Sequence, residues 1–346
     1  MHMADALLSP AVGGVMTAVS AGAIGLSVAK IKNDNKNENP ERFDEKKVPV
    51  MAVMGAFIFA AQMINFTIPG TGSSGHIGGG ILLAAILGPF PALLTLASVL
   101  LIQCLFFADG GLLAYGCNVF NIGVCACLFS YQIIYKPIIK KWGFTKKTIS
   151  FAAVLSAIIG LQAGAFAVVL ETLISGVTNL PFLTFTVLMQ PIHLAIGIIE
   201  GIVTAAVLCF IHSVRPEILD RTVNINDNKK KSYKKVLLIF IIITLLTAGI
   251  FPIFASQLPD GLEWAIEKTA GDEELENPDN TVHEAAENIV NSTAIMPDYS
   301  LPGDNQSKLN TAFAGVAGSI ITVVLAGSIG FVIYIVKSKR KPAGES

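Results

Sequence analysis

The chain has 346 residues, of which 53% are hydrophobic and only 14% charged, and its mean hydropathy is +0.64. Because an ordinary soluble domain carries roughly a quarter charged residues, this composition excludes a typical water-soluble fold and indicates a polytopic membrane protein. The formal net charge of -1 provides no overall field that would attract nucleic acid. No Walker A sequence occurs, so the chain is not expected to bind ATP through a P-loop of its own.

Nine apolar segments are expected to cross the membrane as helices. They cover residues 10–29, 48–66, 78–87, 91–107, 112–135, 149–174, 191–211, 236–254 and 311–336. Clusters of Lys and Arg follow the first, fifth, seventh and ninth segments, and all of them lie inside if the N-terminus is outside. The short segment 78–87 must cross for this parity to hold. The sequence therefore predicts an all-α protein of nine passes with the N-terminus outside and the C-terminus in the cytoplasm.

The polar, lysine-rich stretch 215–235 predicts a cytoplasmic linker between two units. The first unit, 1–214, contains seven of the predicted helices, and the second unit, 236–346, contains two. Between those two helices, residues 255–310 are rich in Asp, Glu, Asn and Pro, and we expect them to form a disordered or loosely structured outer loop.

Two histidines are predicted on the outer face, His2 before the first helix and His76 after the second. We expect the N-terminus to be retained, because Met1 and His2 lack the positive charge of a secretory signal. The amine of Met1, the amide nitrogen of His2 and the imidazole Nδ1 of His2 could then chelate one ion, and His76 could complete a plane of four nitrogens. Such a plane selects Ni(II) or Cu(II), and low-spin Co(II), over Zn(II) or Mg(II). The alternative is that His2 is a solvated terminal residue and His76 an ordinary loop residue.

The segment before His76 also satisfies the dinucleotide pattern G-x-G-x-x-G over residues 70–75. It follows a predicted membrane helix rather than a strand, so we reject a dinucleotide site. The glycines favour a tight loop that brings His76 toward the N-terminus.

Further polar residues could orient the metal ligands or simply support the fold. Asp5 could bond a ligand imidazole or cap the first helix. Asp109 and Asn118 could orient His76, although a turn explains Asp109 equally well. His193 and Glu200 lie one heptad apart within a membrane helix, where ionisable groups usually face the bundle interior. They could support the metal site or hold helices together.

Small residues Gly14, Ala18 and Gly22 recur every four positions in the first helix. Such a stripe lets a second helix approach closely, from the same chain or from a partner. We expect internal packing.

The order of these motifs resembles a known family. Met1-His2 with Asp5, Gly75-His76, Asp109-Gly110-Gly111, residues 118–121 and His193 running into Glu200-Gly201 are similar to the cobalt/nickel substrate-binding (S) component of energy-coupling factor transporters, the CbiM/NikM type. In the second unit, residues 259–263 read PDGLE, which resembles the signature of the small two-helix CbiN/NikN accessory component.

The resemblance implies a fused metal-uptake component that is a transporter subunit and not an enzyme. It implies a seven-helix S component in the cell membrane that binds Ni(II) or Co(II) from outside through Met1, His2 and His76. It also implies two kinds of partner, a membrane coupling (T) component and cytoplasmic ABC-type ATPases. The sequence does not choose between nickel and cobalt.

Two rival functions belong to other classes. An autonomous secondary transporter could use Glu200 and His193 as an ion relay, but no convincing internal repeat is present. An intramembrane hydrolase would need a motif such as H-E-x-x-H or G-x-S-x-G, and neither occurs.

Overall fold

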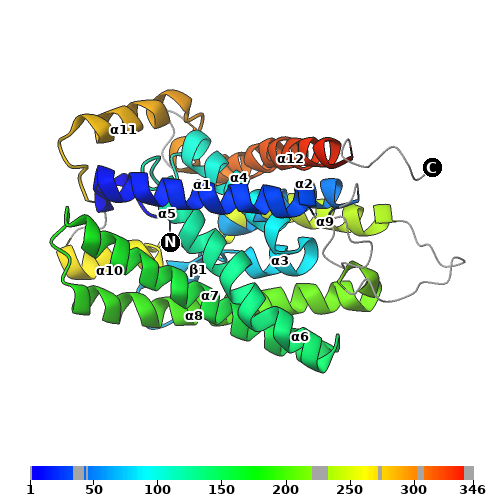
Figure 1. Ribbon diagram of the computed structural model, residues 1–346. Helices are drawn as coiled ribbons and strands as arrows, with labels where there is room; N and C mark the ends of the chain where they lie inside the picture. Colours follow the sequence, from blue (N-terminus) through cyan, green and yellow to red (C-terminus); the bar gives the residue numbers. More distant parts are fainter. Residues whose placement is uncertain are drawn as a thin grey trace, which may run out of the picture.

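The computed structural model of the chain describes residues 2–33, 43, 46–219, 233–271, 275–301 and 308–338. This part of the molecule is predominantly helical (Figure 1). The helices of the first unit are η1 (Asp5–Leu7), α1 (Pro10–Asn33), α2 (Lys47–Gln62), α3 (Gly80–Leu87), α4 (Pro89–Phe107), α5 (Tyr115–Asn118), η2 (Val119–Tyr135), α6 (Lys136–Trp142), α7 (Lys146–Ser175), α8 (Phe182–Val214) and η3 (Pro216–Ile218). Those of the second unit are α9 (Tyr233–Gly249), η5 (Phe251–Phe254), α10 (Gly261–Ala270), α11 (Thr281–Thr293), η6 (Pro297–Tyr299) and α12 (Lys308–Ser338).

Six helices of the described residues are long and apolar enough to cross a membrane. They are α1, α4, the continuous helix formed by α5, η2 and α6, and then α7, α8 and α12. The helices α2 and α9 are apolar but shorter. The expectation of a multi-pass helical membrane protein is therefore confirmed.

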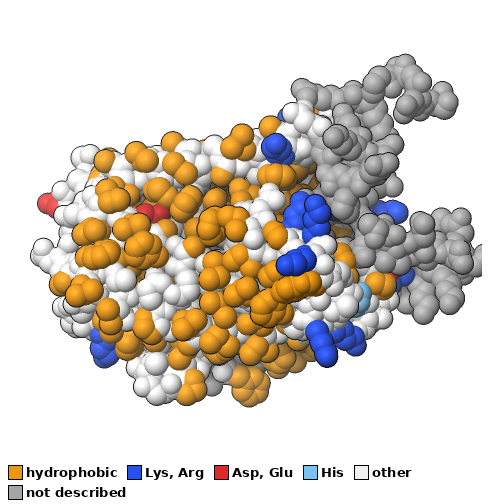
Figure 2. Space-filling model, turned by 60° about the horizontal axis from the view of Figure 1, so that its bottom comes forward, with side chains coloured by type: hydrophobic (Ala, Val, Ile, Leu, Met, Phe, Trp, Pro, Cys, Tyr) orange, Lys and Arg blue, Asp and Glu red, His pale blue; other side chains and the backbone are white. Residues whose placement is uncertain are grey.

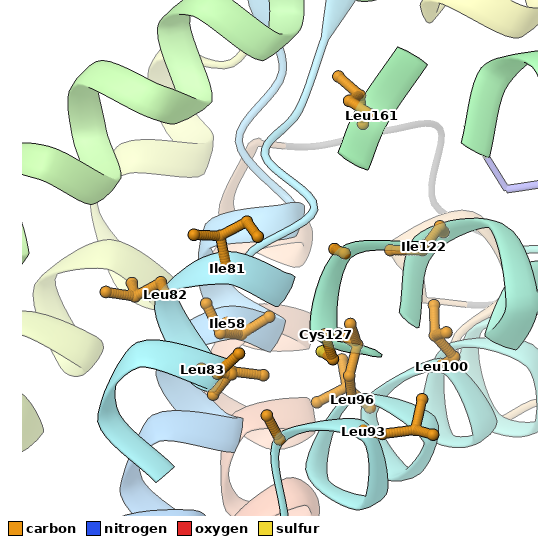
Figure 3. Packing of buried hydrophobic residues seen from close by; sticks show 14 of the residues in the cluster. Ile58, Ile81, Leu82, Leu83, Leu93, Leu96, Leu100, Ile122, Cys127 and Leu161 are labelled. Carbon is orange, nitrogen blue, oxygen red and sulfur yellow. The ribbon is translucent and has the colours of Figure 1, made fainter. Parts of the chain in front are cut away.

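The helix α3 has eight residues, so it rises only about 12 Å, much less than the roughly 30 Å of a bilayer core. It is buried among α2, α4 and η2, where Ile81 and Leu83 lie near Ile58, Leu93 and Cys127 (Figure 3). At its C-terminal end the Nζ of Lys47, at the start of α2, donates to the carbonyl of Leu87 at 2.5 Å. Just before α3, Gly78 and Gly79 lie beside Gln62 and Ile58 of α2.

The helix α8 begins nine residues before the predicted span 191–211. Pro191 lies inside the helix instead of at its start. A proline within a membrane helix is tolerated. Pro191 removes the backbone bond to the carbonyl of Val187, and the side-chain amide of Gln162 on α7 donates to the nearby carbonyl of Gln190 at 2.8 Å. The apolar residues before Pro191 therefore extend the helix.

The prediction that residues 255–310 are loosely structured is wrong for the part that is described. Two helices, α10 and α11, form there, and both begin at side-chain caps, Asp260 and Asn280. Leu262, Ala265 and Ile266 of α10 are buried, and α10 packs against α8. The sequence did not predict these helices because the segment has an acidic composition and most of the other positions in the two helices are exposed.

The two units share one core. The helices α9 and α12 pack against α2, and α12 also packs against α4. Gly318 of α12 lies so close to Phe59 and Phe107 that an added Cβ would fall 2.0 Å from Phe59. The second unit is therefore seated on the first through close helix contacts.

The surface carries a broad apolar belt, and Figure 2 shows Lys and Arg side chains gathered mainly at the right-hand end of the face in view. The small-residue stripe on α1 belongs to the exposed surface, because Gly14, Ala18 and Gly22 are all exposed. No atom lies within 4 Å of a Cβ added at Gly14 or Gly22. The expectation that this stripe packs internally is wrong for the described part of the chain.

Candidate metal site

Backbone hydrogen bonds fix the path of the N-terminal segment. Asn118 accepts from the N–H of Met3 at 2.7 Å through Oδ1 and donates to the carbonyl of Met3 at 3.1 Å through Nδ2. The N–H of Gly111 donates to the same carbonyl at 3.0 Å. Asn118 therefore holds the chain next to His2. This role differs from the suggested one, in which Asn118 would orient His76.

Asp5 serves the same segment. Its Oδ1 accepts from the N–H of Ala114 at 2.8 Å, so it neither caps α1 nor bonds an imidazole. The loop 109–114 passes very close to it: a Cβ added at Gly111 would lie 1.7 Å from Oδ1 of Asp5. Gly110 has φ +82°, a conformation that glycine adopts without strain. The two glycines thus let the loop wrap around residues 3–5.

The imidazole rings of His2 and His76 are stacked, with centroids 5.1 Å apart and planes 18° from parallel. The Nδ1 of His2 lies 2.8 Å from Oδ1 of Asp109, and its Nε2 is buried without a hydrogen-bond partner among the described residues. Asp109 therefore bonds His2 rather than His76. Met1, the third predicted ligand, lies outside the described residues.

The other oxygen of Asp109 accepts a hydrogen bond of 2.5 Å from the hydroxyl of Tyr299 in η6. Burial alone would raise the pKa of Asp109, but the attraction of His2 and the two hydrogen bonds hold it below its ordinary value. An ionised carboxylate is thus directed at the ring of His2.

His76 follows a short hairpin formed by β1 (Phe66–Ile68) and β2 (Ser73–Gly75). The loop after it enters the bundle. There Oε2 and Oε1 of Glu200 accept from the N–H groups of Gly78 and Gly79 at 2.8 and 3.0 Å, and the amide of Gln62 donates to the carbonyl of Gly78 at 2.9 Å. Glu200 therefore anchors the backbone that follows His76.

The ring of His76 is almost enclosed, with a side chain 9% exposed. Burial lowers the pKa of His76 to about 3, and the neighbouring His2 adds to this effect. The imidazole is consequently neutral at physiological pH and offers a lone pair, which is the form that a metal ion requires.

The second unit reaches the same place through its PDGLE sequence. Ser74 of β2 donates from its backbone N–H to the carbonyl of Pro259 at 2.8 Å. Asp260 caps α10 with Oδ1, which accepts from the N–H groups of Leu262 and Glu263 at 2.7 and 3.0 Å. Its Oδ2 lies 3.9 Å from Nε2 of His76.

His193 is buried beside this contact. Its Nδ1 lies 2.7 Å from the carbonyl of Met189, which assigns the proton to Nδ1. Its Nε2 has no hydrogen-bond partner among the described residues, and a Cβ added at Gly261 would lie 3.2 Å from its Cε1. His193 thus lies against the PDGLE turn and supports the wall of the site.

These residues border a cleft of about 700 Å³ between the two units, which we call the N-terminal cleft. Its lining includes His2, His76, Asp109, Asp260, Glu263 and Tyr299. Among the described residues no group of three or more His, Cys, Asp or Glu side chains could hold a metal ion on its own. All five cysteines are free, and four are buried, as expected for inert thiols.

Three of these six lining residues, Asp260, Glu263 and Tyr299, were not predicted as site residues. Asp260 was noted only as part of PDGLE, yet an Asp followed by Glu three positions later is a capping-box pattern that marks a defined helix start. Tyr299 gives no sequence signal, because its contact with Asp109 spans 190 residues.

Comparison with known proteins agrees with the motifs. Residues 2–218 match the family model described as the cobalt uptake substrate-specific transmembrane region, CbiM, and residues 234–335 match the PDGLE domain. The chain belongs to the CbiM family. A protein of Archaeoglobus fulgidus named as a fused nickel transport protein, NikMN, is 30% identical over 325 residues, which cover 94% of this chain and 96% of that protein.

Other relatives carry names for both metals. The cobalt transport protein CbiM of Sorangium cellulosum is 30% identical over 174 residues, which are 50% of this chain and 76% of that protein. The crystal structure of a truncated transition metal transporter superimposes with a TM-score of 0.52 at 30% identity, covering 62% of this chain and 99% of that one. This chain is therefore a multi-pass membrane protein related to nickel and cobalt transport proteins.

Proposed function

We propose that this chain captures Ni(II) or Co(II) at its extracellular N-terminus, as the substrate-binding component of an ATP-dependent energy-coupling factor uptake system in the cytoplasmic membrane. The observation that carries the proposal is the stacking of His2 on His76 beside a rigidly held N-terminal segment. The four donors are the amine of Met1, the amide nitrogen and Nδ1 of His2, and an imidazole nitrogen of His76. Four nitrogens in a plane suit Ni(II) and low-spin Co(II).

Metal capture has to displace one contact. Nδ1 of His2 faces Asp109 in this structure, whereas the chelate uses Nδ1. In the proposed step the ring turns about its Cβ–Cγ bond and gives Nδ1 to the ion, and Asp109 moves to accept from the Nε2–H. A carboxylate that accepts from the distal N–H of a ligating imidazole fixes the ring and increases its basicity.

The roles of Glu200 and His193 favour this proposal over a secondary transporter. Both oxygens of Glu200 bond the amides of Gly78 and Gly79, and Nδ1 of His193 bonds Met189. Glu200 thus supports the His76 loop and His193 lies against Gly261 of the PDGLE turn, so structural contacts account for both residues without an ion relay.

The proposed orientation is nine passes, with α3 and the extended residues before it completing the short one. The positive-inside rule supports it, because Lys and Arg side chains gather mainly at the right-hand end of the face in Figure 2. Figure 1 places α10 and α11, which border the N-terminal cleft, at the left-hand end. The exposed small-residue stripe of α1 offers a face on which a helix of the T component can pack closely. The ATPases are separate partners of that assembly.

The test is metal accumulation by cells that supply the T component and the ATPases. His2→Ala and His76→Ala should each abolish accumulation of the transported metal while the amount of protein in the membrane stays normal. His212→Ala, in the last turn of α8, is the matched control and should behave as the unmodified chain. Normal accumulation with either site variant would refute the proposal.

A further inference from the structure

His283 connects the second unit to the N-terminal segment. It lies in the first turn of α11 and is 1% exposed. Its Nε2 is 3.1 Å from the carbonyl oxygen of Asp5 and 3.0 Å from that of Leu8. These two carbonyls belong to the start and the C-terminal flank of η1, the short helix between His2 and α1.

Both ring nitrogens of His283 face acceptors. Nδ1 lies 2.9 Å from Oδ1 of Asn280. The same oxygen of Asn280 also accepts from the N–H groups of Val282 and His283 at 3.1 Å each. Because both of these groups are donors, the atom that faces them is the amide oxygen and not the amide nitrogen. Each ring nitrogen of His283 therefore lies within hydrogen-bond distance of a carbonyl oxygen.

An N–H at Nε2 can donate to the carbonyls of Asp5 and Leu8 together, because carbonyl oxygens only accept. Both carbonyls lie in the N-terminal segment, so these contacts tie α11 to the chain that leads to His2.

We infer that His283 is a positioning residue for metal capture: through the carbonyls of Asp5 and Leu8 it fixes the segment that directs His2 at His76. The inference rests on the proposed function and assigns to the second unit a specific contact with the ligand-bearing N-terminus. Loss of His283 releases the segment on one side, while Asn118 still holds it on the other. Metal affinity then falls without loss of any ligand.

The test compares Ni(II) and Co(II) affinities of the purified full chain, measured by titration in detergent. His283→Ala should weaken binding on the order of tenfold, as expected for the loss of one or two buried hydrogen bonds. His283→Gln keeps an N–H group that can reach the carbonyls and should restore most of the affinity. Val290→Ala removes a buried apolar contact from the same helix and should lower thermal stability but leave the affinity unchanged.

Two results would overturn the inference. One is an unchanged affinity in His283→Ala; the other is an equal loss of affinity in His283→Ala and Val290→Ala, which would mean that docking of α11 alone matters. Failure of the unmodified chain to bind either metal would instead overturn the proposed function. The two failures are therefore distinguishable.

Discussion

The carboxylate of Asp109 lies 2.8 Å from Nδ1 of His2. The contact joins the loop after α4 to the second residue of the chain, and Tyr299 of the other unit bonds the opposite oxygen of the same carboxylate. Asp109 thus fixes the ring of His2 in this structure, and the proposed metal capture transfers this contact from Nδ1 to Nε2.

Removing this carboxylate should weaken metal binding without abolishing it. Asp109→Ala is expected to lower the affinity for Ni(II) roughly 10- to 100-fold, the usual cost of losing the group that orients a ligating histidine. Titration of the purified chain measures it. Tyr299→Phe keeps the carboxylate and loses only its second partner, so its effect should be smaller, and an effect as large as that of Asp109→Ala would contradict this ranking.

Gly111 is expected to tolerate no side chain. In Gly111→Ala the new Cβ would meet the carboxylate and backbone nitrogen of Asp5, which must push residues 3–5 out of place at about 1–3 kcal/mol. Thermal unfolding and metal titration should both show a loss. Gly14→Ala is the control, because nothing lies within 4 Å of its added Cβ. It should leave metal binding unchanged and should not lower thermal stability, since alanine favours the helix more than glycine does.

Glu200→Gln tests the anchor of the His76 loop. One of its two acceptor positions becomes an amide that faces a backbone N–H, and an unsatisfied buried donor costs about 1–3 kcal/mol. The free energy of unfolding should fall by that amount, and metal affinity should fall with it. If stability and affinity were both unchanged while transport was lost, a relay role for Glu200 would be favoured instead.

The exposed stripe on α1 yields a prediction about assembly. Gly22→Leu fills the small-residue face and should prevent close approach of a partner helix, so cellular accumulation should fall while the purified chain still binds metal. Val15→Leu, at an exposed position of α1 beside the stripe, should retain accumulation. Weakened metal binding in purified Gly22→Leu would show that the stripe serves the chain itself.

The sequence predicts the helices well where apolar runs are long. The predicted segments 10–29 and 91–107 correspond to α1 and α4, since hydrophobic length alone determines such spans. The start of α8 was missed because a proline usually marks the end of a helix, and the sequence does not show the neighbouring helices among which Pro191 is packed. The helices α10 and α11 were missed because each buries only three or four residues and the whole stretch 255–310 is polar.

The sequence also indicates that His2 and His76 share one side of the membrane, and the structure brings their rings together. The sequence does not predict which residue forms a hydrogen bond with which histidine. Asp109 and Asn118 were expected near His76, but the loop after α4 folds over residues 2–5, and this choice depends on the close approach of Gly111 to Asp5. His283 and Tyr299 reach the N-terminal segment only through tertiary contacts from the other unit.

The central claim is that the N-terminal amine is a metal ligand, and absorption spectroscopy of the detergent-purified chain with its native, untagged N-terminus tests it most directly. The chain is loaded with Ni(II) or Co(II) beside a variant that carries one additional residue before Met1. We predict stoichiometric metal with a square-planar d–d band in the native chain and loss of both in the extended variant. Equal binding and equal spectra in the two proteins would contradict the account, because the N-terminus would then not be a ligand.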